Sequence, residues 1–280
     1  MEIVSVDSML VYRGLDVGTA KPTPSERAAV RHHLIDVADP SEDWSVARFQ
    51  AAARAAVADV EARGRRALLV GGTGLYVRAV VDDLRFPGED LAVRARLEVE
   101  AADPDGLARL YDDLVARDPV AATKVEPGNV RRIVRALEVM EVTGQPFSAS
   151  GVGLDHHGAT VFPVRQLGIW LPGAVLHARI GARVDRMYAD GLLDEVGALT
   201  APGRPPLSRT AAQAIGYREA LAVVEGDEPS VDAARAATAL RTRQFARRQI
   251  RWFRRDPRVL WWGTPTNPDR LAPALLECCR

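Results

Sequence analysis

The 280-residue sequence predicts an α/β fold in which a parallel sheet forms the core and a helical segment is inserted into it. Short uncharged runs alternate with amphipathic helical patterns, as in sheets that helices cover on both faces. Between residues 86 and 150 the helical patterns continue without a convincing strand. We therefore expect a core of residues 1–85 and 151–280 and a helical insertion of residues 86–150.

The N-terminal part is predicted to alternate strands with helices. The strands are expected at residues 3–6, 33–37 and 67–70. A short helix should begin after Thr23, because Pro24 is well tolerated at the first helical position. A longer helix should begin after Ser45, which can cap it, and end at Gly64. A tight glycine loop at residues 71–74 then leads into another helix.

The remaining elements follow from the same patterns. In the insertion, helices are expected at residues 91–102, 104–117 and 129–143. Beyond it we expect a strand at 166–171, helices at 174–188, 191–199 and 230–254, a strand at 259–262 and a short terminal helix. The segment 201–207 is rich in Pro and Gly and is predicted to be a loop.

Composition is typical of soluble globular proteins. Apolar residues make up 47% and charged residues 26% of the chain. Lys plus Arg and Asp plus Glu both number 37, so net charge favours no class of partner. The two cysteines, Cys278 and Cys279, are adjacent and lack metal-ligand spacing, which favours a reducing compartment. Because we find no signal-peptide pattern and no apolar run of about 18 residues, we expect a cytoplasmic protein without membrane contact.

Asp7 and Ser8 follow the first predicted strand, at the carboxyl end where open α/β sheets place their ligands. A carboxylate there is well placed to accept a proton or to hold a cation. The same residue could equally do no more than cap the next turn. The sequence leaves both interpretations open.

The glycine loop and three arginines are candidates for anion binding. Bare amides at a helix N-terminus can hold an anion, and Thr73 adds a hydroxyl, although a tight turn without a ligand would have the same sequence. Arg179 and Arg183 are four residues apart on one predicted helix, where they can grip a phosphate or lie on the surface. Arg218 follows a predicted helix–turn–helix junction around Gly216, which could aim it into a cleft.

One predicted helix is strongly basic. No acidic residue lies between Asp232 and Asp256, whereas eight arginines do. Four of these arginines share one helical face: Arg243, Arg247, Arg251 and Arg254. Helix faces in contact with water usually mix both signs of charge, so this stripe favours a polyanion. A second basic run, at residues 131–135, lies in the insertion, and the two runs together predict an RNA or DNA that contacts both parts.

Several motifs occur in the order and spacing of one known family. They lie at residues 5–8, 12–14, 18–22, 33–37, 70–76, 132–138, 215–218 and 242–249. Through them the chain resembles the tRNA dimethylallyltransferases from residue 1 to about residue 263. The resemblance implies a P-loop NTPase-like core of the ATP-binding type and a monomeric protein.

The resemblance also implies a reaction. The family transfers a dimethylallyl group from dimethylallyl diphosphate to N6 of the adenine at position 37 of tRNA, next to the anticodon. By its place in the motifs, Asp7 matches the general base, and Thr73, Arg183 and Arg218 match catalytic groups around the diphosphate. The residues expected to bind the diphosphate are Gly71, Gly72, Thr73, Arg179 and Arg183. Mg²⁺ is expected on the diphosphate, with no protein ligand assigned to it.

A further set of residues matches family positions that contact the anticodon stem-loop of tRNA. In the core these are Asp7, Ser8, Met9, Leu10, Gln213, Gly216, Tyr217, Arg218, Arg243, Arg247, Arg248, Gln249, Arg251 and Arg254. In the insertion they are Arg94, Arg131, Arg132 and Arg135. The family usually has Gln where this chain has Arg131, which adds a charge. The target adenine leaves its stack to enter a channel through the core, as is general for enzymes that act on bases.

The sequence as given departs from the family at one point. It contains no G-x-x-x-x-G-K-[ST] phosphate loop, which family members carry about thirty residues before the Asp7 strand. The P-loop and the first strand of the expected core are therefore missing from it. We expect translation to begin upstream, so that the intact mass of the endogenous protein exceeds the calculated 30.4 kDa. The alternatives are a truncated copy that only binds tRNA and a P-loop kinase, which the basic helix disfavours.

Overall fold

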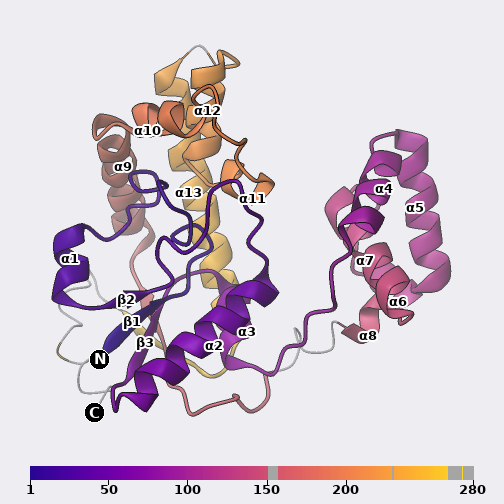
Figure 1. Ribbon diagram of the computed structural model, residues 1–280, viewed down its shortest axis with the longest axis horizontal. Coiled ribbons are helices and arrows are strands. Elements are labelled where there is room, and N and C mark those ends of the chain that lie inside the picture. The colour runs from indigo at the N-terminus through magenta and orange to yellow at the C-terminus, as the bar shows by residue number, and fades with distance from the viewer. Residues whose placement is uncertain (151–156, 229, 264–272, 274–280) are drawn as a thin grey trace. The chain divides into compact units, whose positions relative to one another are not determined.

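The computed structural model describes the chain except for residues 151–156, 229, 264–272 and 274–280 (Figure 1). The chain forms two compact units, one made of residues 1–81 and 162–280 and the other of residues 82–161. The expected insertion, residues 86–150, lies within the second unit. The predicted terminal helix falls almost entirely outside the described residues.

Three parallel strands form the sheet at the start of the first unit, in the order β2–β1–β3. β1 (Glu2–Ser5) lies between β2 (His32–His33) and β3 (Ala67–Val70), with Ile3 opposite both His32 and Leu68. Parallel strands end at the same edge of a sheet. The residues that follow β1 and β3, including Asp7 and the glycine loop, therefore meet at one edge.

The strand predicted at residues 33–37 is wrong beyond His33. Leu34 and Asp36 have φ angles of +61° and +58°, in the left-handed region that regular strands do not use. These turns place the Asp36 carboxylate 2.6 Å from both Lys21 and Arg27. The ion pairs of one polar residue therefore override the apolar pattern of the segment.

The helices of the N-terminal part follow the prediction closely. They are α1 (Pro24–Ala29), α2 (Val46–Ala62) and α3 (Gly74–Val81). The side chains of Thr23 and Ser45 accept hydrogen bonds from backbone amides in the first turns of α1 and α2. α2 buries Phe49, Ala53 and Val57 along one face, as its apolar period requires. Capping and periodicity therefore suffice to predict these helices.

The C-terminal part of the first unit is mostly helical. Its helices are α9 (Gly173–Ala189), α10 (Leu192–Leu199), α11 (Arg209–Ala212), α12 (Tyr217–Glu225) and α13 (Val231–Phe253). β4 (Gln166–Trp170) and β5 (Val259–Gly263) pair in parallel as a separate two-stranded sheet. The two strands and the long helices are confirmed, whereas the four-residue α11 is too short to give a periodic signal. None of the described helices is long and apolar enough to cross a membrane.

One hydrophobic core joins the elements of this unit. Val4, Val6, Phe49, Leu192 and Tyr217 belong to it, and each is at most 1% exposed. They come from β1 and the residue after it, from α2, and from α10 and α12, which are distant in the sequence. The core therefore fixes α10 and α12 beside the sheet.

The second unit is helical, apart from an isolated bridge between Asp82 and Thr160 in its described part. Its helices are α4 (Leu91–Ala101), α5 (Pro104–Arg117), α6 (Pro119–Ala122), α7 (Val130–Thr143) and α8 (Phe147–Ser150). Leu97, Leu114, Ile133 and Leu137 are at most 1% exposed and form a core of their own. The three long helices were predicted, and the two four-residue helices were not.

Candidate functional site

Asp7 lies two residues beyond the end of β1, and only one of its two carboxylate oxygens accepts hydrogen bonds from described residues. Oδ1 accepts hydrogen bonds from the amides of Met9 at 2.7 Å and Leu10 at 3.3 Å. Oδ2 forms no hydrogen bond with any described residue. Ser8, Met9 and Leu10 continue the turn and are half-buried, as is Asp7 itself. Asp7 therefore caps the turn with one oxygen and keeps the other available for a proton.

The glycine loop presses against the segment that leads to Asp7. The Val6 amide donates to the carbonyl oxygen of Val70 at 2.7 Å. A Cβ atom at Gly71 would lie 2.0 Å from the carbonyl oxygen of Val6, so no side chain fits there. Thr73 follows in the loop and its carbonyl oxygen starts the hydrogen bonding of α3. The loop and Asp7 are therefore direct neighbours.

Two side chains of α13 cover the outside of this loop. Gln249 Nε2 donates to the carbonyl oxygen of Gly72 at 3.0 Å. A Cβ at Gly74 would lie 2.2 Å from the Trp252 ring. Gln249, which was expected to contact tRNA, is thus engaged with the glycine loop in this structure.

Arg183 on α9 approaches Asp7 from a different element. Its Nη2 atom donates to the carbonyl oxygen of Thr19 at 3.1 Å. Desolvation by the surrounding protein lowers the pKa of Arg183, and the Asp7 carboxylate opposes this shift. The Arg183 side chain nevertheless remains open to solvent. The structure therefore brings together Asp7, the glycine loop and a cation that a ligand can reach.

A buried lysine holds the segment between β1 and α1. The Lys21 side chain is 4% exposed, and its Nζ lies 2.5 Å from Asp16 Oδ1 and 2.6 Å from Asp36 Oδ1. The same ammonium donates to the carbonyl oxygen of Tyr12 at 2.8 Å. Because a buried charge is costly without partners, these contacts hold the segment in one conformation. The sequence motif contained Lys21 but indicated no role for it.

Gly216 and Tyr217, which were expected to contact tRNA, are buried. The Tyr217 hydroxyl donates to the Glu195 carboxylate and accepts from the Gly18 amide at 3.1 Å. Burial and the neighbouring Glu195 raise the pKa of Tyr217, so its hydroxyl stays neutral. Gly216 has a φ of +95°, and its amide donates to Glu219 at 2.8 Å where α12 begins. Both residues hold neighbouring elements in place.

Three other predicted residues lie on the surface of this unit. Arg179 is on α9, Gln213 follows α11, and Arg218 is on α12. All three side chains are exposed, and none forms a hydrogen bond or ion pair with a described residue. The structure does not bring them into contact with Asp7.

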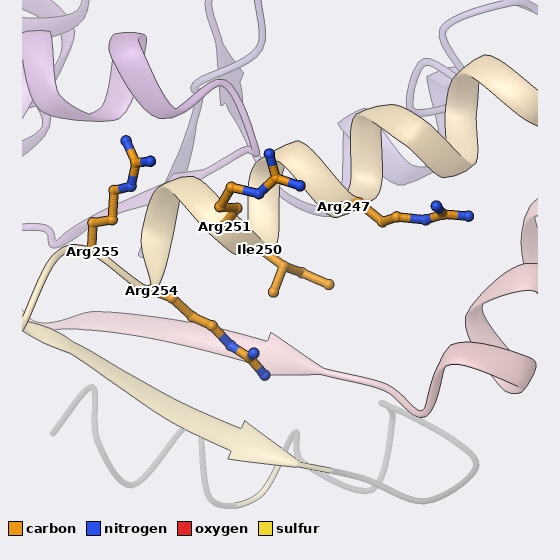
Figure 2. Close-up of a pocket in the computed structure, with 5 residues that line it drawn as sticks. All are labelled: Arg247, Ile250, Arg251, Arg254 and Arg255. Carbon is orange, nitrogen blue, oxygen red and sulfur yellow. The ribbon is translucent and has the colours of Figure 1, made fainter.

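The arginines at the end of α13 surround a shallow hollow of about 480 Å³ (Figure 2). It is lined by Arg247, Ile250, Arg251, Arg254 and Arg255. Figure 2 shows these side chains extending from the last turns of α13 and from the two residues that follow it, with no acidic side chain among the lining residues. We call Arg247, Arg251 and Arg254 the arginine face. It presents three like charges to solvent.

The structure divides the basic run of α13 into two groups. Arg235 pairs with Asp232 at 2.8 Å, and Arg241 pairs with the buried Glu219. By contrast, six arginines form no ion pair with any described residue. They are Arg243, Arg247, Arg248, Arg251, Arg254 and Arg255. Unpaired guanidinium groups along one helix and the two residues after it are well suited to donate hydrogen bonds to nucleic-acid phosphates.

The predicted arginines of the second unit also divide. Arg131 is exposed and has no partner among the described residues, and Arg132 donates only to the carbonyl oxygen of Lys124. Arg94 and Arg135 converge instead on Glu138, at 2.9 Å and 3.0 Å. Arg131 and Arg132 are thus the more available pair for a polyanion.

Glu138 is fully buried and organises this unit. It accepts hydrogen bonds from Arg94, Arg135 and the amide of Asp90. Burial alone would raise the pKa of Glu138, but the hydrogen bonds from Arg135 and Arg94 outweigh it and lower the pKa. The ionised form is therefore the one that stabilises the fold.

Glu138→Gln is expected to lower the free energy of unfolding by about 1–3 kcal/mol, because two guanidinium groups lose the negative charge of their common partner and one of its two acceptor oxygens. Urea denaturation followed by circular dichroism measures this. Since the folded pKa lies below the ordinary 4.5, the difference from wild type should be full at neutral pH and shrink as the pH falls through the folded pKa. Glu141→Gln is the matched control, because its partner Arg96 is 55% exposed and such pairs contribute about 0–1 kcal/mol. Equal effects of the two substitutions would contradict the special role of Glu138.

The chain is similar to several known proteins. A family model described as IPP transferase matches residues 10–256. The chain is 55% identical over 270 residues to the tRNA dimethylallyltransferase of Kineococcus radiotolerans, covering 96% of this chain and 83% of that protein. It is similar to the crystal structure of the full-length tRNA isopentenylpyrophosphate transferase from Bacillus halodurans, with a TM-score of 0.69, 36% identity and coverage of 99% and 86%. A structure of a eukaryotic dimethylallyltransferase acting on tRNA gives a TM-score of 0.76 at 25% identity, with coverage of 99% and 72%.

Proposed function

Because the chain belongs to the IPP transferase family, we propose that it transfers a dimethylallyl group from dimethylallyl diphosphate to N6 of adenine 37 in tRNA, next to the anticodon. The observation that carries the proposal is Oδ2 of Asp7, which forms no hydrogen bond with a described residue, lies next to the glycine loop and interacts electrostatically with Arg183. The transfer requires a group that takes a proton and groups that hold a departing anion. These residues supply both kinds of group.

Asp7 acts as the general base in this reaction. The adenine amine attacks C1 of the dimethylallyl group, so that a C–N bond forms while the C–O bond to the diphosphate breaks. The electron pair of the broken bond leaves with the diphosphate, and the N6 proton passes to Oδ2 of Asp7. Because the amides of Met9 and Leu10 hold Oδ1, the carboxylate keeps one orientation as it accepts the proton.

We assign the diphosphate to the glycine loop. Negative charge accumulates on the diphosphate as it leaves, and fixed donors at that point stabilise the transition state. The amides of Gly71 and Gly72 and the Thr73 hydroxyl lie at the N-terminus of α3, which favours an anion. Arg183 adds a positive charge. Arg179 and Arg218 are exposed without partners in the described structure and can turn toward the bound substrate.

Mg²⁺ is proposed to arrive with the diphosphate. Among the described residues, no group of three or more His, Cys, Asp or Glu side chains could hold a metal ion. Mg²⁺ commonly binds through substrate phosphates and only one or two protein groups. The Thr73 hydroxyl fits this second mode at the edge of the sheet, and Oδ2 of Asp7 is left for the N6 proton. When bound there, the ion would neutralise charge on the leaving diphosphate.

We propose that tRNA binds to unpaired arginines of both units. In the first unit these are Arg243, Arg248 and the arginine face, and in the second they are Arg131 and Arg132. Guanidinium groups without acidic partners can exchange solvent ions for phosphates at little cost. Arg94, Arg135, Gly216, Tyr217 and Gln249 support these surfaces from within their own units.

The direct test is the nucleoside content of tRNA from a strain that lacks this protein. Loss of N6-dimethylallyladenosine, with return when the gene is restored, is the expected result. Unchanged levels in a strain without a second copy would contradict the proposal. The binding-only alternative, which the relatives' names do not support, predicts salt-sensitive tRNA binding by the purified protein without prenyl transfer.

Gln249→Ala is expected to raise the KM for dimethylallyl diphosphate several-fold, because the glycine loop loses the hydrogen bond at Gly72. The KM for tRNA should change less. Steady-state kinetics with each substrate varied in turn measures both values. Gln244→Ala is the matched control, since Gln244 is an exposed glutamine on the same helix. A larger effect of Gln249→Ala on tRNA than on the diphosphate would instead make Gln249 an RNA contact.

The likeness to the family also leads us to propose that the protein is a cytoplasmic monomer. Light scattering coupled to size-exclusion chromatography tests the oligomeric state. A mass near twice that of one chain would contradict it.

A further inference from the structure

A single carboxylate binds three consecutive amides of the segment between β1 and α1. Glu195 Oε2 accepts from Asp16 at 3.1 Å and Val17 at 2.8 Å, and Oε1 accepts from Gly18 at 3.4 Å. Successive amides that point at one anion form a nest, a structure that elsewhere binds phosphates. In this chain, the anion in the nest is a side chain of α10, which lies beside the segment (Figure 1).

Tyr217 closes the nest from α12. Its hydroxyl donates to Glu195 and accepts from the Gly18 amide at 3.1 Å. Its ring fills the space beside Gly18, where a Cβ would lie 2.4 Å from the ring. Both oxygens of the Glu195 carboxylate are therefore held by donors, and the segment cannot move without breaking several hydrogen bonds.

The next residue connects the nest to the candidate active site. The carbonyl oxygen of Thr19 accepts from Arg183 Nη2 at 3.1 Å, and Arg183 interacts electrostatically with Asp7. On the other side, Lys21 binds Asp16 and Asp36. The nest and Lys21 therefore hold the Thr19 carbonyl from its two sides, and what occupies the nest contributes to the position of Arg183.

We propose that Glu195 is a positioning residue for the transfer reaction, acting as a built-in anion that orders residues 16–18 and thereby holds Arg183 beside Asp7. The inference rests on the proposed function. Glu195 contacts neither substrate. Without it, the amides of residues 16–18 and the Tyr217 hydroxyl lose the carboxylate as an acceptor, and the Thr19 carbonyl is held less firmly, by the Lys21 contacts and the local turn alone.

The test is chemical rescue of Glu195→Ala. We expect kcat to fall about 10- to 100-fold, the cost of misplacing a catalytic group by about 1 Å, while the affinity for tRNA is retained. Because the nest binds a carboxylate, added formate should restore much of the lost kcat. Formamide has a similar shape but no charge, and it should restore none. Failure of formate, or equal rescue by formamide, would overturn the proposal.

Three further measurements keep the outcome clear. Asp194→Ala, at the exposed neighbouring position on α10, should leave kcat unchanged with or without formate. If Glu195→Ala does not fold, Glu195→Gln replaces it, and full activity of that folded variant would overturn the proposal. Absence of transfer by the wild-type protein would overturn the proposed function itself, whereas wild-type activity without formate rescue would overturn only the role of Glu195.

Discussion

Asp7→Asn is expected to lower the rate of dimethylallyl transfer by about 10²- to 10⁴-fold, the range that a positioned general base contributes. Asparagine keeps an oxygen that can accept from the amides of Met9 and Leu10, so the turn after β1 should persist. The variant loses only the carboxylate oxygen that takes the N6 proton. Single-turnover kinetics with saturating tRNA measures this loss, and tRNA affinity measured alongside should change little.

Asp7→Ala separates the two functions of this side chain. It removes the base and also the acceptor that holds the turn, so it should be as inactive as Asp7→Asn and additionally less stable by about 0.5–1.5 kcal/mol, the net contribution of a typical hydrogen bond. Thermal unfolding of both variants measures this difference in stability. If Asp7→Asn instead loses tRNA binding or unfolds like Asp7→Ala, Asp7 has a structural role and a different base must be sought.

The sequence predicts the fold best where an element is long. α2, α7 and α13 each span several turns, so their apolar periods and caps can be recognised in the sequence without knowledge of tertiary contacts. The four-residue helices α6, α8 and α11 contain about one turn and no period. The strand prediction for residues 33–37 was wrong for another reason. Their apolar pattern is that of a strand, but Lys21 and Arg27 bind Asp36 and impose left-handed turns.

The candidate site is predictable to the extent that it depends on strand ends. Asp7 and the glycine loop each follow a strand, and parallel strands carry such residues to one edge. Glu195 and Glu138 gave no comparable signal, because each is one of two acids in an amphipathic helix and the pattern does not distinguish it from its neighbour Asp194 or Glu141. Their partners lie far away in the sequence, up to 179 positions for Glu195 and 48 for Glu138. Only the folded chain reveals what these two carboxylates bind.

The basic run of α13 is a pattern that the sequence does show, but the sequence does not show which of its arginines form ion pairs. By sequence, helical spacing singles out Arg243, Arg247, Arg251 and Arg254 among its eight arginines, but spacing does not show which guanidinium groups have acidic partners. In the structure, Arg241 is committed to the buried Glu219 and Arg235 to Asp232, whereas the arginine face has no acidic partner in the described part of the chain. The count of charges therefore identifies the basic helix. The ion pairs then show which of its arginines are available to bind phosphates and displace counterions from the RNA.

Arg247→Ala combined with Arg251→Ala is therefore expected to flatten the plot of log Kobs for tRNA against log salt by about 1.4–1.8, since each lost phosphate contact removes about 0.7–0.9 from the slope. If the wild-type and variant lines meet near 1 M salt, this corresponds to about 15- to 30-fold weaker binding near 0.15 M. Fluorescence anisotropy with a labelled anticodon stem-loop, repeated over a salt series, measures the slope directly.

Arg235→Ala, compared with the single variant Arg247→Ala, is the matched control for this effect. It removes the same charge from the same helix, but from a guanidinium that pairs with Asp232 at 2.8 Å. Its slope should equal that of the wild type, whereas an equal flattening would mean that net charge alone attracts the RNA. An unchanged slope in the double variant would place the arginine face away from the RNA. Since these arginines are proposed to bind phosphates and Asp7 to move the proton, kcat at saturating tRNA should survive the double substitution and be lost in Asp7→Asn.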